Sequence, residues 1–337
     1  MNEPRPGLRD VARLAGVSLS SASRALSDTA SASPRLRARV QAAARELGYE
    51  PNLLAQSLSR GATGLIGFMV REIQSPGVPP VLHGAEATLR EAGYALVFAT
   101  AEGRSDLAAD YLRVLRQRRM DGLVMVLADA DHPAIREQLE RLDVPCVLYD
   151  SEVDWLDASS VLYDQRSSAQ EAAATLARLG HRRLAFVAGR ATMRTTAEVE
   201  AGLRAGLAEA GAGELRVEAG DFTLEHGHEA TRRLLLGTDA PTALVAGNAQ
   251  VAHGVIAALR ELGLRPGRDV SLVCAEEPPT LLLLDPPVAA IRWDYVEVGA
   301  TLARLLLRRL EGGPAERAVV ATTFVPGETC APPPAAA

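Results

Sequence analysis

A short segment near the amino terminus carries side chains that can contact nucleic acid. The outward side of a short predicted helix presents Leu19, Ser20, Ser21 and Arg24. A leucine can contact a thymine methyl group, a serine hydroxyl can bind a base edge, and a guanidinium can bridge guanine O6 and N7 or bind a phosphate. Ser18 and Ser21 suit phosphate contacts, which fix register on a duplex. For Leu19 the alternative is packing beside the next helix.

Motifs typical of enzymes and metal sites are absent from the sequence. We find no Gly-x-Ser-x-Gly elbow, no phosphate-binding Gly-rich loop, no HExxH and no CxxC. His226 and His228 are better explained as hydrated loop residues than as a metal pair. Glycines 61, 64 and 67 have nucleotide-fingerprint spacing but precede and enter a predicted strand, so they do not indicate a dinucleotide site. We predict no catalytic residues, no metal and no cofactor.

Composition and charge set broad limits. The 337 residues are enough for two or three domains, and no apolar run approaches the ~20 residues that span a bilayer. No signal peptide is recognised, and the three cysteines are far apart, so we expect a cytoplasmic protein. The net charge is −6, yet residues 1–60 hold nine arginines and five acidic residues. A basic head on an acidic body favours a DNA-binding domain joined to another, although a merely solvated surface is the alternative.

Three short helices are predicted in the first fifty residues. The first covers residues 8–15 and ends at Gly16, which suits a left-handed turn, and Ser18 can cap the second over residues 19–26. Ser33 caps a third helix, which Gly48 ends. The side chains predicted to share one core are Leu8, Val11, Ala12, Ala15, Ala22, Ala25, Leu26, Leu36, Val40, Ala43 and Leu47. Two helices joined by so tight a turn form a helix-turn-helix.

The amino-terminal motifs carry a family resemblance. The run DVARLAGVSLSSASRAL, followed by SPRLRARVQAAARELGYEPNLLAQSL, resembles the LacI/GalR family of bacterial transcriptional regulators. The resemblance implies that the second helix enters the major groove. It also implies a sequence-specific regulator, a repressor, that binds a palindromic operator in double-stranded DNA as a homodimer. Its affinity is expected to be modulated by a small-molecule effector, sugar-like or of another class.

The resemblance further implies a hinge helix from Asn52 to about Ser59. A helix this short is marginal in water, so we expect it to form on the operator. Leu58 is then a wedge for the minor groove at the operator centre, while Asn52 and Ala55 also contact DNA or the partner hinge. An ordinary linker with incidental leucines is the alternative.

After residue 62 strands and helices alternate. Predicted strands cover residues 65–70, 95–99, 122–127, 146–149, 184–188, 243–246 and 271–274. Predicted helices cover residues 80–92, 106–118, 135–142, 169–179, 198–210, 228–236 and 251–262. Two such series indicate two parallel sheets covered on both faces. The predicted fold class is therefore α/β, an all-α helix-turn-helix domain followed by a two-subdomain core that resembles periplasmic binding proteins.

The predicted domain boundaries follow from these patterns and from the family resemblance. They are a helix-turn-helix domain (residues 1–50), a hinge (51–61), an effector-binding and dimerisation core (62–330) and a disordered tail (331–337). Within the core, the first subdomain takes about residues 62–160 and 290–320, and the second takes about residues 161–289 and 321–330. The chain is thus expected to cross between subdomains near residues 160, 289 and 320.

The expected effector pocket departs from the family pattern. Ser75-Pro76-Gly77-Val78 stands where the family often has Asn-Pro-Phe-Phe, and Val199 stands where an arginine often binds the ligand. The candidate ligand contacts are Asp164, Arg194, Asn248, Glu276 and Trp293. Trp293 can supply an aromatic face, and Arg194 or Arg71 can replace the lost guanidinium. We expect a hydroxylated or cationic ligand that differs from the usual sugars, with a decayed pocket and an effector-independent regulator as the alternative.

The assembly prediction rests on one apolar run. Leu281–Leu284 is too apolar for a free loop and is expected to bury against a second subunit or the adjacent sheet. No heptad pattern follows Phe324, so we predict a dimer rather than a tetramer. A cytoplasmic solute-binding protein is the remaining alternative, which the basic head opposes.

Overall fold

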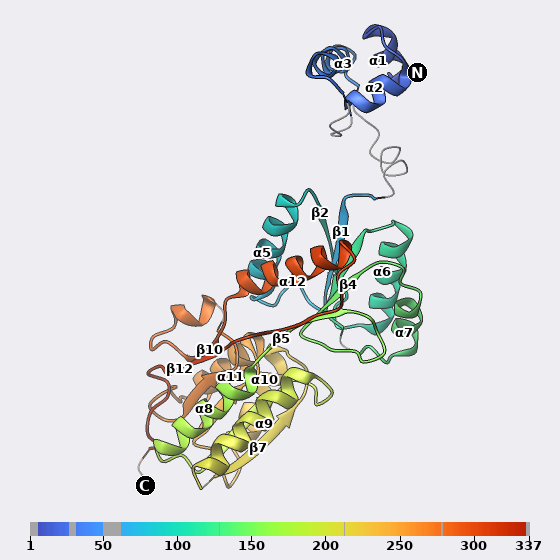
Figure 1. Cartoon of the computed structure of the whole chain (residues 1–337). Coiled ribbons are helices and arrows are strands. Elements are labelled where there is room, and N and C mark those ends of the chain that lie inside the picture. The colour runs from blue at the N-terminus through green and yellow to red at the C-terminus, as the bar shows by residue number, and fades with distance from the viewer. Residues whose placement is uncertain are drawn as a thin grey trace. The chain divides into compact units, whose positions relative to one another are not determined.

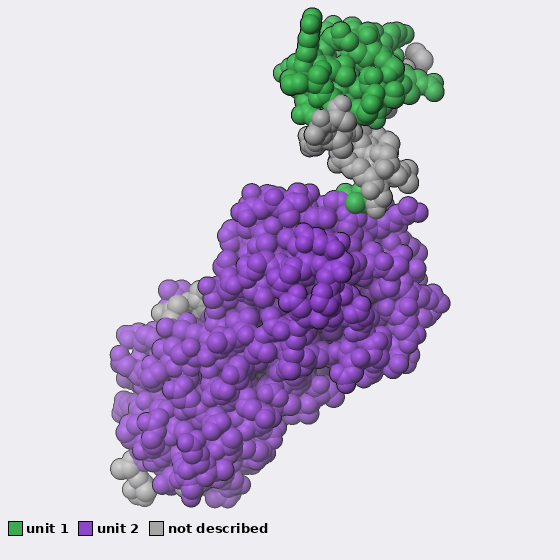
Figure 2. Space-filling model, viewed as in Figure 1, with its two compact units in different colours: residues 1–63 green, residues 64–337 purple. Residues whose placement is uncertain are grey.

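The computed structural model describes residues 6–26, 32–49, 62–127, 129–211, 213–277 and 279–334. The chain forms two compact units, residues 1–63 and 64–337, which have separate colours in Figure 2. The predicted hinge contacts Asn52, Ala55 and Leu58 lie outside the described residues.

The amino-terminal unit is a three-helix cluster. Its helices are α1 (Leu8–Leu14), α2 (Leu19–Leu26) and α3 (Pro34–Glu46). Gly16 has a φ of +61°, the left-handed conformation expected of the turn between α1 and α2. The predicted core is confirmed: Val11, Ala12, Ala15, Ala22, Ala25, Val40 and Ala43 are buried in it, and Leu8, Leu26, Leu36 and Leu47 pack against it.

The carboxyl-terminal unit contains two six-stranded sheets, which confirms the predicted α/β class (Figure 1). In spatial order, the first sheet consists of β11 (Arg317–Val320), β5 (Ser159–Tyr163), β4 (Cys146–Tyr149), β3 (Gly122–Met125), β1 (Leu65–Val70) and β2 (Ala95–Thr100). The second consists of β12 (Thr323–Val325), β10 (Ala289–Arg292), β9 (Ser271–Cys274), β8 (Ala243–Ala246), β6 (Arg183–Ala188) and β7 (Glu214–Ala219). Neighbouring strands are parallel, except that β12 runs antiparallel to β10.

Helices cover both faces of each sheet. The first lobe packs α5 (Val78–Glu91) and α12 (Tyr295–Leu310) on one face of its sheet and α6 (Ser105–Gln117) and α7 (Pro133–Glu140) on the other. The second lobe does the same with α8 (Gln165–Arg178) and α9 (Arg194–Glu209), and with α10 (Leu224–Leu235) and α11 (Ala249–Glu261). Side chains therefore alternate along each strand: Phe68 contacts one helical layer and Met69 the other.

The chain passes between the lobes three times. Strand β5 keeps residues up to Tyr163 in the first lobe, so the first crossing lies at residue 164 rather than 160. Strand β10 belongs to the second lobe, which moves the second crossing from residue 289 to the segment after Arg292. The third crossing follows Val320, before β12 begins. Periodicity alone does not locate β5 or β10, because both are short and neither alternates apolar with polar residues.

The structure corrects the prediction of a disordered tail from residue 331, and it bears out the predicted burial of the leucine run only in part. Residue 331 begins the predicted disordered tail, but the Ala331 carbonyl accepts hydrogen bonds from the Ser271 hydroxyl (2.8 Å) and the His181 ring (2.7 Å), which dock it on the second lobe. In the leucine run, Leu281 is buried against the adjacent core, whereas Leu283 is 85% exposed. Among the described residues, we find no helix with the length and apolarity that a membrane crossing requires.

Close packing of α5 on α12 gives a test of the fold. A Cβ atom at Gly84 would lie 2.0 Å from the Val296 carbonyl oxygen, so Gly84→Ala must push the helices apart. We expect the free energy of unfolding to fall by about 1–3 kcal/mol in urea denaturation. Gly237→Ala is the control, because its Cβ would meet backbone oxygens at an ordinary 3.5 Å. Equal stability of the two variants would contradict this packing.

Candidate functional site

The outward face of α2 is the first candidate surface. Ser18, Leu19, Ser20 and Arg24 are exposed, while Ala22 and Ala25 on the opposite side are buried. Leu19 is 45% exposed and is not among the side chains packed on the three-helix core, so its alternative role as a packing residue is not supported. The face predicted to read DNA is therefore accessible within this unit.

Hydrogen bonds order the serines and leave the arginine available. The Ser18 hydroxyl accepts from the Ser21 amide at 3.2 Å, which is the predicted cap, and donates to the Ser21 hydroxyl at 2.8 Å. Ser21 is half-buried and so less free than Ser20. The Arg24 Nε donates to the Ser20 carbonyl at 3.4 Å, and no ion pair of Arg24 is found among the described residues. Its guanidinium can therefore serve a phosphate or a guanine.

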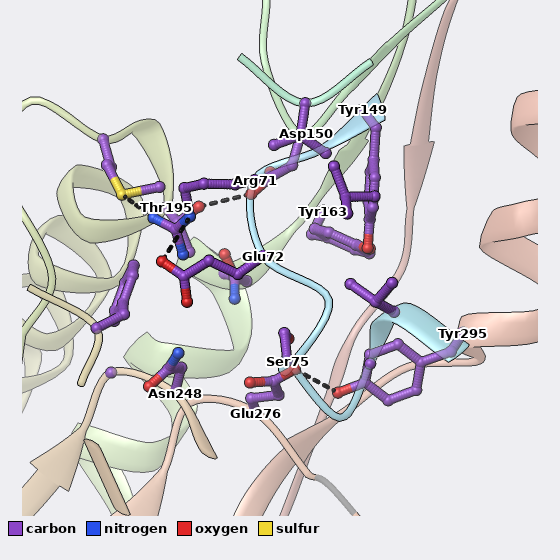
Figure 3. Close-up of a pocket in the computed structure, with 18 of the residues that line it drawn as sticks. Arg71, Glu72, Ser75, Tyr149, Asp150, Tyr163, Thr195, Asn248, Glu276 and Tyr295 are labelled. Carbon is purple, nitrogen blue, oxygen red and sulfur yellow. Dashed lines mark hydrogen bonds and ion pairs between the residues drawn. The ribbon is translucent and has the colours of Figure 1, made fainter. Parts of the chain in front are cut away.

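A cavity of about 130 Å³ lies in the second unit, where the carboxyl ends of strands from both lobes meet (Figure 3). Ligands of open parallel sheets bind at such strand ends. Arg71 and Glu72 follow β1, Asp150 follows β4, Asn248 follows β8 and Glu276 follows β9. The remaining lining residues are Val70, Ser75, Gly77, Val78, Val126, Tyr149, Tyr163, Gln165, Met193, Thr195, Phe222, Gly247, Trp293 and Tyr295.

Asp150 joins the two lobes across this cavity. Its carboxylate accepts from the Thr195 hydroxyl at 2.6 Å and from the Arg194 guanidinium at 3.2 Å, both on the first turn of α9. Arg194 also donates to the Tyr163 carbonyl at 3.0 Å. Burial raises the pKa of Asp150, and Arg194 and Thr195 oppose that rise. The contact holds a first-lobe carboxylate to a second-lobe helix.

Glu276 lies on the opposite wall. One carboxylate oxygen accepts from the Tyr295 hydroxyl at 3.0 Å (Figure 3). The other accepts from the Ala249 amide at 3.1 Å. The residue is 8% exposed, and burial raises its pKa despite these donors and nearby Arg71. Each oxygen keeps a lone pair that can accept from a further donor.

Four aromatic rings form one wall of the cavity. Ring centroids are 6.0 Å apart for Tyr149 and Tyr163, 4.8 Å for Tyr163 and Trp293, and 5.1 Å for Trp293 and Tyr295. A Cβ atom at Gly77 would lie 2.5 Å from the Tyr295 ring. Gly77, the position where the family pattern has an aromatic residue, therefore makes room for an aromatic ring from α12.

The structure brings together three of the five predicted effector contacts. Asn248, Glu276 and Trp293 line the cavity. Asp164 does not: helix α8 begins four residues earlier than predicted, and the Asp164 carboxylate caps it by accepting from the Ser167 amide at 3.2 Å. Arg194 does not line it either, because α9 also begins four residues early and Arg194 pairs with Asp150.

Several residues that line the cavity were not predicted from the sequence. Asp150, Thr195 and the three tyrosines were not singled out, and Arg71 was offered only as an alternative to Arg194. A usable signal existed, because Arg71 and Asp150 directly follow correctly predicted buried strands. Val199, which replaces the expected arginine, is 1% exposed in the core beneath α9 rather than in the cavity.

Comparisons with known proteins agree with this architecture. Residues 7–52 match the model for bacterial regulatory proteins of the lacI family, and residues 173–330 match a periplasmic binding protein-like domain. The ribose operon repressor of Escherichia coli K12 is 32% identical over 314 residues, covering 90% of this chain and 92% of that protein. The chain belongs to the lacI family.

Another curated repressor and two solved structures of regulators are also similar to this chain. The HTH-type transcriptional repressor PurR of Photobacterium profundum is 28% identical and covers 93% of this chain and 94% of its own. A lac repressor dimer bound to operator and the anti-inducer ONPF superimposes with a TM-score of 0.85 at 25% identity, covering 97% of this chain and all of that one. A complex of the regulator CelR with cellobiose gives 0.73 at 27%, covering 96% and 100%.

The buried Glu276 carboxyl predicts a pH dependence. Its raised pKa means that the folded state holds the proton more tightly than the unfolded state, so Glu276 lowers stability as the pH rises above the usual glutamate value of 4.5. We expect Glu276→Gln to lose less stability than the parent between about pH 4.5 and pH 8. Thermal unfolding across this range measures it, and Glu225→Gln, on the surface of α10, is the control. Identical pH profiles for the parent and Glu276→Gln would contradict the assignment.

Proposed function

We propose that this lacI-family protein is a transcriptional repressor that binds a palindromic operator as a dimer, and that a small molecule in the cavity modulates its affinity for DNA. The observation that carries the proposal is the exposed face of α2, ordered by Ser18 and opposite a buried alanine face. Relatives that cover nine-tenths of the chain are named repressors, and the lac repressor structure is a dimer on its operator.

In this proposal α2 lies in the major groove. Leu19 and Ser20 are placed for base edges, Arg24 for a guanine or a phosphate, and Ser18 and Ser21 for phosphates. Two copies related by a two-fold axis then read two half-sites. Asn52, Ala55 and Leu58 keep their proposed role as hinge contacts, with Leu58 as the minor-groove wedge.

The cavity supports an effector role because both lobes supply its walls. Arg71, Asp150 and Tyr295 come from the first lobe, and Asn248 and Glu276 come from the second. A ligand that contacts both lobes favours the arrangement in which those contacts are made, and it shifts the population toward that arrangement. We propose that this shift changes operator affinity. The experiments below test the DNA-binding and assembly parts.

The exposed Arg24 generates the sharpest test of DNA binding. Arg24→Ala removes a charge-assisted contact worth about 1.5–3 kcal/mol, so operator affinity should fall by roughly 10- to 150-fold. The measurement is a gel shift on duplexes selected from a random pool by the parent protein. Arg13→Ala is the matched control, because Arg13 is also exposed but pairs with Asp10 on α1. Equal affinity of the Arg24 variant and the parent would remove the recognition role of α2.

The oligomeric state is a separate prediction. Light scattering of the full chain should give twice the 35.7 kDa of one copy at micromolar concentration. A two-fold symmetric operator requires two recognition helices, so a monomer at those concentrations would contradict the dimer proposal. A mass of four copies would contradict the prediction that the chain forms no tetramer.

A further inference from the structure

We infer that the cavity takes a polyhydroxylated carboxylic acid, of the hexuronate or aldonate class, and that Arg71 binds its carboxylate. The inference rests on the proposed effector function for its regulatory meaning. The binding claim itself concerns the side chains of one cavity and is measured without DNA.

Arg71 is a largely buried guanidinium with weak partners. Its side chain is 21% exposed. Nη1 donates to the Met193 thioether at 3.0 Å, the guanidinium lies 5.3 Å from the Phe222 ring centroid, and Nε is 4.0 Å from the Glu72 carboxylate (Figure 3). A guanidinium carries five N–H donors, and a thioether is a weak acceptor. Burial lowers the pKa of Arg71, and the nearby carboxylates of Glu72, Asp150 and Asp221 oppose that fall.

Glu72 is a replaceable counter-ion. Its side chain is 37% exposed, and its 4.0 Å separation from Arg71 is at the limit of an ion pair, against 3.2 Å for the pair of Arg194 and Asp150. Glu72 and Arg71 also line a second hollow of about 320 Å³ beside the first, which gives the glutamate a route to solvent. A ligand carboxylate can make two parallel hydrogen bonds with the guanidinium, which is stronger than the present contact.

Two other lining residues, Gln165 and Trp293, carry polar atoms that suit hydroxyl groups on the same ligand. The Gln165 Oε1 and the Trp293 Nε1 are buried and have no hydrogen-bond partner among the described residues. Gln165 is 3% exposed, so water from outside does not serve it freely. One atom needs a donor and the other an acceptor, and a hydroxyl can be either. The free lone pairs of Glu276 accept from further hydroxyls, and the aromatic wall suits the C–H face of a sugar ring.

The same contacts disfavour a purely cationic ligand. The Asp150 carboxylate already accepts from Arg194 and Thr195. A cation would add no partner to Arg71 and would lie near its charge. Among the charged groups that line the cavity, the Arg71 guanidinium therefore has the weakest partners, and an anion is the ligand that would pair with it.

Trp293 provides the binding signal. The chain has two tryptophans, and Trp155, which stacks with Arg136 outside the cavity, is removed by Trp155→Phe. We titrate this variant with D-glucuronate, D-galacturonate and D-gluconate, and with D-glucose, D-galactose and D-glucosamine as matched neutral and cationic probes. At least one acid should bind roughly 10-fold or more tightly than its neutral parent sugar, as a charge-assisted contact predicts.

Variants in the same background assign the contact. Arg71→Met should weaken binding of the acid by roughly 10- to 150-fold. Arg71→Lys keeps the charge but loses the paired N–H donors of the guanidinium, so its affinity for the acid should lie between those of Arg71→Met and the parent. Arg190→Met is the matched control, because Arg190 lines the second hollow and pairs with Asp221. It should change affinity less than about 3-fold, as expected of a partly exposed pair. Thermal unfolding of each variant shows whether it is folded, and if Arg71→Met is not, Arg71→Lys carries the test.

The outcomes separate this inference from the proposed function. No binding by any of the three acids up to 10 mM, or tighter binding of a neutral sugar or the amine, overturns the inference. Equal weakening by Arg71→Met and Arg190→Met overturns the role of Arg71. Operator binding is measured independently, both for the ligand-free protein and in the presence of each acid. If that binding is absent the proposed function fails, whereas operator binding without acid binding contradicts this inference alone.

Discussion

A carboxylate that is buried away from water needs hydrogen-bond donors. Asp150 of the first lobe receives them from Arg194 and Thr195 of the second lobe. The residue follows β4 with a φ of +51°, a left-handed conformation that aspartate adopts more readily than most residues. This turn directs its carboxylate to Thr195 and Arg194, which are fixed on the first turn of α9. Separation of the lobes would return Asp150 and Arg194 to water together, so the contact sets which arrangement the cavity side chains can share.

The parallel sheets explain why so many polar groups reach this place. Because each strand returns through a helix, all strand ends of one polarity lie on one edge of a sheet. Three crossings of the chain turn the carboxyl edges of both sheets toward one cavity. The helices that begin there contribute as well: Thr195 lies on the first turn of α9 and Tyr295 opens α12. The apolar cores on the two faces of each sheet hold the strand ends in place.

The sequence predicted local structure better than contacts across the cavity. In the three-helix unit, caps, turn glycine and core are neighbours in sequence, so the core side chains between Leu8 and Leu47 could be assigned from spacing. The strands β1, β4, β8 and β9 have the predicted bounds because each is a compact apolar run. The first turns of α8 and α9 were missed because they are polar and lack apolar periodicity. Asp164 and Arg194 lie there, and their partners are set by helix starts that spacing does not show.

Two changes relative to the family pattern make sense only in three dimensions. Position 77 has lost an aromatic residue, yet an added side chain there would collide with the ring of Tyr295, which comes from more than two hundred residues away. Val199, which stands where the family pattern often has an arginine, is buried in the core of the second lobe, and Arg71 brings a guanidinium to the cavity from the end of β1. Because the interior is close-packed, only one large side chain fits in a given space. A glycine at position 77 therefore allows the Tyr295 ring to occupy the space there. A comparison of motifs shows only that the aromatic residue and the arginine are absent from their usual positions. The folded structure shows that Tyr295 and Arg71 bring an aromatic ring and a guanidinium to the cavity from other elements.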